Sequence, residues 1–173
     1  MATFTERMVG AARLDGRTFE EVERDTRADT QAIGVVVLSA VAAGVGAGAG
    51  LRGLIFGTVG ALVLWAIWAA LVYWVGTQLL PEADTRADWG QVARTVGFAQ
   101  APGVLRVLAI IPVLGELIRA VVDVWVLIAT VIAVHQALDY SSDYRSWLRA
   151  LGVCAIGWGF QIIAFAVLRR MLV

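Results

Sequence analysis

Apolar runs of about 20 residues, separated by short polar segments, occupy most of the sequence after residue 31. A helix needs about 20 apolar residues to cross a hydrocarbon core of roughly 30 Å. The segments that reach or approach this length are 32–50, 54–80, 95–112, 114–138 and 148–168. The pattern therefore predicts an all-α, polytopic integral membrane helical bundle, with a domain of five transmembrane helices over residues 32–173.

Residues 1–31 follow a different pattern, with charges throughout and apolar side chains only at helical spacing. Phe19 and Val22 lie on one narrow face of such a helix. Thr18 and Glu21 have the spacing of a capping box at a helix start. We expect an N-terminal amphipathic helical segment on the cytoplasmic side. It would either lie on the lipid headgroups or pack on the loops as a solvated helix.

The composition agrees with a membrane protein and gives its orientation. The chain is 60% hydrophobic and 16% charged, against about 45–50% and about 25% in globular domains. Its formal net charge is zero, so no global field attracts nucleic acid. With the N-terminus inside, nine arginines lie in cytoplasmic segments and three in outer ones. Basic loops stay cytoplasmic, so we expect a multi-pass protein of the cell membrane with a cytoplasmic N-terminus and an outside C-terminus.

Charged residues lie inside the two predicted helices that meet at Pro112, and they are Arg106, Glu116, Arg119 and Asp123. The last three share one face of a helix. If the chain reverses at Pro112, Arg106 lies at a depth between the two carboxylates and could pair with either. Charges at membrane depth are costly and usually face one another or a cavity. This intramembrane polar cluster is either a neutral network that fixes helix pairing or the lining of a proton, ion or headgroup path.

A proline and an amide side chain interrupt the third predicted helix. Pro102 removes a helical hydrogen bond, which predicts a kink or break there. Gln100 would then face either the freed carbonyl or a cavity. Pro112 marks the second break, at the turn of the hairpin.

Small residues dominate the end of the first predicted helix. Gly44 with Gly48, and Gly46 with Gly50, form two overlapping small-xxx-small pairs. Such pairs let helix backbones approach closely. We expect them to serve helix–helix packing, within the protomer or between protomers of a homo-oligomer.

Residues that could carry chemistry are few. His135 is the only histidine, and Asp139 is its only nearby companion at helical spacing. No nucleophile with a base, no phosphate-binding loop and no zinc signature is present. We therefore expect no metal, no cofactor and no catalytic residue, and we interpret the chain as non-enzymatic.

Three stretches resemble the Yip1-domain family in its small prokaryotic form: AARLDGRTFEEVERD before the first apolar run, GFAQAPGVLRVLAIIPVLG, and VWVLIATVIAVHQALDYSS. The resemblance covers nearly the full chain and rests on diffuse, apolar patterns. It implies five spans, a cytoplasmic N-terminus and no enzymatic activity. Eukaryotic relatives bind Rab-type GTPases through a long N-terminal region that is largely missing here, so that property is not carried over. Some bacterial relatives are implicated in the assembly of ABC-type exporters.

Two functional hypotheses follow. The first is an integral membrane adaptor, assembly factor or membrane-organising element, whose partners are the lipid bilayer and a membrane protein such as an ABC-type exporter. The alternative is a small transporter or channel that uses the Arg/carboxylate cluster as its polar path. A water-accessible cavity reaching Asp123 and Gln100 would favour the alternative.

Overall fold

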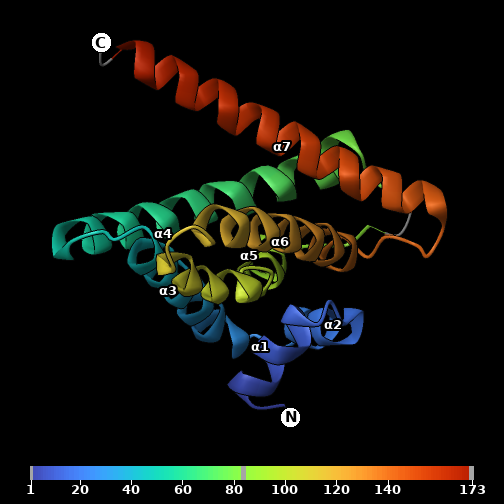
Figure 1. Ribbon diagram of the computed structural model, residues 1–173. Helices are drawn as coiled ribbons and strands as arrows, with labels where there is room; N and C mark the ends of the chain where they lie inside the picture. Colours follow the sequence, from blue (N-terminus) through green and yellow to red (C-terminus); the bar gives the residue numbers. More distant parts are fainter. Residues whose placement is uncertain (1, 83–84, 172–173) are drawn as a thin grey trace.

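Helices make up the secondary structure of residues 2–82 and 85–171, which the computed structural model describes, with side chains as far as residue 160. No strand occurs among these residues. The elements in chain order are α1 (Phe4–Ala12), α2 (Gly16–Arg24), α3 (Ala28–Gly46), α4 (Leu51–Trp74), the π-helical turn η1 (Val75–Leu79), α5 (Trp89–Phe98), the 3-10 helix η2 (Ala101–Ile110), α6 (Gly115–Ala137) and α7 (Tyr144–Met171). Figure 1 shows α3 to α6 grouped together, with α1 and α2 on one side and α7 crossing the other.

Long apolar helices support the prediction of a membrane protein. Among the described residues, three helices are long and apolar enough to span a bilayer: α3, α4 with its continuation to Leu79, and α6. They match the first, second and fourth predicted spans. The fifth prediction, 148–168, falls within α7, whose side chains after residue 160 lie outside the described part.

The third predicted span, 95–112, is not one α-helix, in agreement with the break expected at Pro102. The α-helix α5 ends at Phe98, and a 3-10 helix follows from Ala101. Pro102 sits at the start of η2, where a missing N–H costs nothing. A proline also disfavours the helical conformation of the residue before it. The break at Pro102 is therefore confirmed, but the backbone already leaves the α-helix several residues earlier.

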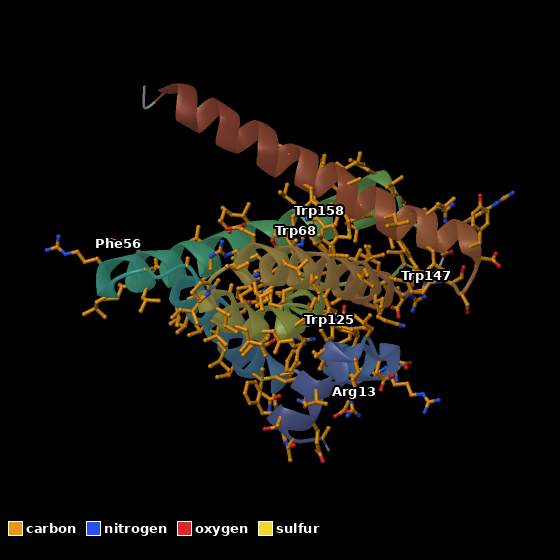
Figure 2. The ribbon with its side chains drawn as sticks, viewed as in Figure 1. Arg13, Phe56, Trp68, Trp125, Trp147 and Trp158 are labelled. Carbon is orange, nitrogen blue, oxygen red and sulfur yellow. The ribbon has the colours of Figure 1, made fainter. Side chains whose placement is uncertain are left out.

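The N-terminal helices pack into the bundle and do not form a separate unit. Phe19 and Val22 are fully buried, in one cluster with Phe98 of α5 and Ala129 of α6. The indole Nε1 of Trp125 donates to the Ala12 carbonyl at 2.8 Å, and Figure 2 shows Trp125 on the side of the bundle that faces these helices. The predicted boundary between residues 31 and 32 falls inside α3.

The capping box predicted at Thr18 and Glu21 is wrong. Helix α2 begins two residues before Thr18, and Asp15 is its N-cap, accepting from the Arg17 N–H. Glu21 instead accepts from Arg7 of α1. The side chain of an acidic residue in mid-helix is free to make such a tertiary ion pair, which a local pattern does not reveal.

The four glycines at the end of α3 serve different purposes, which corrects the prediction for two of them. A Cβ on Gly46 would lie 2.0 Å from the Arg106 carbonyl oxygen, and one on Gly44 would meet the Leu54 side chain at 2.6 Å. These two permit close packing. Gly48 has a φ of +69° and ends α3 in a Schellman motif, and Gly50 is the N-cap of α4 with open space around it.

Candidate functional site: a polar-floored groove

A groove of about 440 Å³ opens between α4 and α6, with α3 and η2 as its floor. Its lining includes Ala61, Leu64, Trp65 and Trp68 of α4, Val126, Leu127 and Thr130 of α6, and Trp158 of α7. Polar residues on or beside this floor include Ser39 of α3, Gln100 and Arg106 from the start and middle of the η2 segment, and Asp123 of the adjoining wall on α6. This volume lies within the range of small-molecule sites, about 300–1,000 Å³, which are also mostly apolar with a few polar groups.

An ion pair between η2 and α6 forms the centre of the floor. Arg106 Nε and Nη2 lie 2.9 Å and 2.8 Å from the same oxygen of Asp123, Oδ1. Its remaining nitrogen, Nη1, donates to Ser39 Oγ at 3.2 Å. The pair forms because the chain reverses after η2, with Val113 in the left-handed region at φ +70°, so that α6 runs back past Arg106. The sequence left Glu116 and Asp123 open as partners, and Asp123 is the partner observed.

The other two charges of the predicted cluster form a separate pair. Arg119 bonds Glu116 one helical turn earlier, and its Nη2 donates to the Gly46 carbonyl at 3.2 Å. Gly46 is the last residue of α3, where carbonyls lack helical partners and the helix dipole is negative. Arg119 therefore caps the end of α3, while Glu116 is largely exposed. The predicted cluster is divided into a groove pair and a capping pair.

Tryptophans of α4 and α7 form part of the groove wall. Trp65 donates to the Ala93 carbonyl at 3.1 Å, which fixes α4 on α5. Trp68 stacks on Trp158 with ring centroids 5.7 Å apart and planes 10° from parallel. Figure 2 shows these two rings side by side where α7 crosses α4. Beyond this contact the backbone of α7 stands away from the other helices (Figure 1), and among the residues with described side chains Trp158 is the member of α7 that lines the groove.

The two members of the ion pair differ in exposure. The Arg106 side chain is 20% exposed and that of Asp123 is 62% exposed. Within the described residues both hydrogen bonds reach Oδ1 of Asp123, so Oδ2 remains free to accept a further donor. The floor of the groove is thus electrically neutral but presents one carboxylate oxygen.

A second polar cluster, which sequence reasoning missed, closes the loops at the opposite end of the bundle. Glu82 accepts from the Ser141 N–H at 3.1 Å and the Ser146 hydroxyl at 2.5 Å, and pairs with Arg149 at 2.8 Å. These bonds, that of Ser146 foremost, lower the pKa of Glu82 to about 2. Tyr140 donates to the Leu80 carbonyl at 2.6 Å. No spacing in the sequence signals this cluster, because Glu82 and Ser141 come from two separate loops and Ser146 and Arg149 from the first turns of α7.

His135 lies beside this cluster as a packed residue. Its ring stacks on Trp147 at 4.0 Å, and its Nε2 lies 3.0 Å from the Ser141 carbonyl oxygen. Among the described residues no group of three His, Cys, Asp or Glu side chains could hold a metal ion.

Buried charges join the N-terminal helices to the bundle. Arg7 is 2% exposed and bonds Glu21, Asp25 and Gln31. These bonds lower the pKa of both carboxyls. Arg94 of α5 is similarly buried. The ion pairs hold α1, α2 and the start of α3 against one another.

Glu23 of α2 is a buried carboxyl, and the charges of Arg24 and Arg94 only partly offset the effect of its burial. It is 5% exposed, and Gln91 Nε2 donates to its Oε1 at 3.3 Å. Arg94 reaches only its main-chain carbonyl, at 2.7 Å. Burial, with the charge of Asp139 nearby, raises the pKa of Glu23 to about 7.

Comparisons of the chain with protein-family models, with curated proteins and with solved structures found no match.

Proposed function

We propose that the chain is a five-pass integral membrane protein of the Yip1-domain type that acts as an adaptor or assembly factor for another membrane protein. The observation that carries the proposal is the groove between α4 and α6, an apolar channel with a neutral polar floor. Grooves between helices at membrane depth fit a hydrophobic partner with a matching polar group. If lipid occupies the groove instead of a protein, the same groove supports a membrane-organising role.

The order of contacts supports five passes. A Cβ on Gly97 would meet Ala32 at 2.9 Å, and one on Gly46 would meet Ala109 at 3.3 Å. The segment from α5 through η2 therefore runs beside α3 in the same direction. From Ala32 to Gly46 the rise is about 21 Å at 1.5 Å per residue. The segment from α5 through η2 runs beside α3 over this distance, although it is not a continuous α-helix.

The fifth pass is supported in the same way. Trp68 stacks on Trp158, and Leu80 lies against Gly152, so α7 runs antiparallel to α4. Together with the arginine distribution, this arrangement supports the proposed cytoplasmic N-terminus and outside C-terminus.

Labelling with a membrane-impermeant thiol reagent tests the topology in intact cells. In a Cys154→Ala background, a cysteine at Gly50, where a side chain meets open space, should react from outside, and one at Ser142 only after the membrane is opened. Cross-linked co-purification of the tagged chain from native membranes tests the adaptor role. A second membrane protein at near-equal abundance is the expected result, and recovery of the chain alone would contradict it.

The alternative of a small transporter or channel is also supported, because the groove brings together Gln100 and the Arg106–Asp123 pair. This function requires flux through the protein. Purified chain in liposomes should then pass protons or ions, and Asp123→Asn should abolish the flux. Liposomes that stay tight with the unmodified chain would exclude the alternative.

A further inference from the structure

Asp123 places a charged oxygen on an open face at membrane depth. It lies eight residues after the start of α6, about 12 Å along the helix at 1.5 Å per residue. Its side chain is 62% exposed, whereas its neighbours on α6, Val124, Leu127 and Ile128, are exposed apolar residues. Ionisable groups that face lipid in this way are costly and normally have a polar partner.

The charge of the groove selects the kind of partner. Arg106 neutralises Asp123 through two hydrogen bonds to Oδ1. A cation bound at the remaining oxygen would leave a net positive charge within the hydrocarbon, and an anion would have to displace Asp123 from Arg106. A neutral hydrogen-bond donor fits without either cost.

The depth of the groove selects the source of that donor. Phospholipid headgroups lie outside the hydrocarbon core, and acyl chains have no donor. A transmembrane helix can present a serine, threonine, asparagine or glutamine at any depth, and such side chains hydrogen-bond across helices. The flanking walls, Leu64 on α4 and Leu127 on α6, are exposed and apolar, as contact with a second helix requires.

We propose that the groove between α4 and α6 docks a single transmembrane helix of a partner protein, which donates a hydrogen bond from a neutral polar side chain to Asp123. This inference rests on the adaptor function and names the class of partner. The docking helix lies along the groove, with its polar residue level with Arg106 and Asp123.

Two adjacent residues provide a matched test. Leu127 lines the groove and is 41% exposed, while Ile128 lies outside the lining and is 42% exposed. A photoreactive amino acid is introduced at either position in the full chain, and native membranes are irradiated. Adduct peptides are then mapped by mass spectrometry. We expect position 127, and not 128, to yield adducts with a transmembrane segment that contains a serine, threonine, asparagine or glutamine near the cross-linked site.

The role of Asp123 is tested in the same experiment with the double variant Arg106→Met and Asp123→Leu, which removes both charges together and leaves none unpaired. Loss of one interhelical hydrogen bond should reduce the adduct at position 127 about fivefold. Retained melting temperature of the variant shows that the fold persists.

Several outcomes overturn the inference. Adducts with lipid alone identify the groove as a lipid site, and adducts with a second copy identify it as a self-association face. Equal adduct yields at positions 127 and 128 would show that the partner does not bind in the groove. An adduct that the double variant leaves unchanged, in a protein that is still folded, would show that Asp123 does not contact the partner. A stoichiometric partner in co-purification without an adduct at 127 defeats the docking site but leaves the adaptor function standing.

Discussion

Ionisation of Glu23 should loosen the attachment of α2 to the bundle as the pH rises. The carboxyl is 5% exposed and accepts one hydrogen bond, from Gln91. Burial is the main cause that raises its pKa from 4.5 to about 7, and the charges of Asp139 and Glu20 add to it. Protonation is therefore favoured in the folded state. The stabilisation is complete below about pH 4.5 and is lost as the pH rises through about 7.

The size of the effect follows from the two pKa values. A change from 4.5 to about 7 corresponds to about 3 kcal/mol. Solvent screening of the neighbouring carboxylates reduces this to about 2 kcal/mol. For a chain of this length that loss lowers the melting temperature by roughly 4–8 °C.

Thermal melts of the detergent-solubilised chain between about pH 5 and about pH 8.5 measure the effect. Glu23→Gln imitates the protonated carboxyl, so it should match the unmodified chain at the acid end and exceed its melting temperature at the alkaline end. Glu116→Gln is the control, because Glu116 is 88% exposed, pairs with Arg119 and is not among the charges that shift the pKa of Glu23. Parallel profiles for the unmodified chain and Glu23→Gln across this range would refute the reasoning.

Three further predictions concern packing and ion pairs. Gly46→Ala should lower the free energy of unfolding by about 1–3 kcal/mol, because its Cβ would lie 2.0 Å from the Arg106 carbonyl oxygen. The control Gly57→Ala, at a position with open space around it, should be neutral or stabilising by up to about 1 kcal/mol. Equal melting temperatures of the two variants would contradict the close approach at Gly46. Asp123→Ala should lower the melting temperature more than Arg106→Gln combined with Asp123→Asn, since it leaves Arg106 unpaired; equal losses in detergent melts would disprove the pairing. At neutral pH, Glu82→Gln should lower the free energy of unfolding by about 1–2 kcal/mol. Because the pKa of Glu82 is lowered to about 2, the difference in stability between the two proteins should shrink between about pH 4.5 and about pH 2. Acid unfolding followed by tryptophan fluorescence measures it.

The helices and their breaks were predictable because they depend on local properties. Apolar length alone indicated α3, α4 and α6, and Pro102 indicated the interruption of the third segment. The close approach of η2 to α3 at Gly46 was not predictable, since it joins segments that are about 60 residues apart in the sequence. The end of α3 at Gly48 was misjudged for a related reason, because a glycine in a small-residue run can either pack a helix or terminate it.

The charged residues of the candidate site were visible in the sequence, but their pairing was not. Spacing placed Glu116, Arg119 and Asp123 on one face and left two partners for Arg106. Rotation of the helices about their axes decides between the two, and it is set by contacts between segments distant in sequence. The same holds for Glu82, whose partners lie about 60 residues later.

An all-helical chain with membrane-length apolar helices follows from the amino-acid pattern alone, because hydrophobic length and proline breaks act within a few turns of the backbone. The pairing of Arg106 with Asp123, the capping of α3 by Arg119 and the packing of α1 and α2 on the bundle became visible only in the folded chain. Each of these contacts joins side chains from separate helices, so its existence depends on packing that no single segment contains.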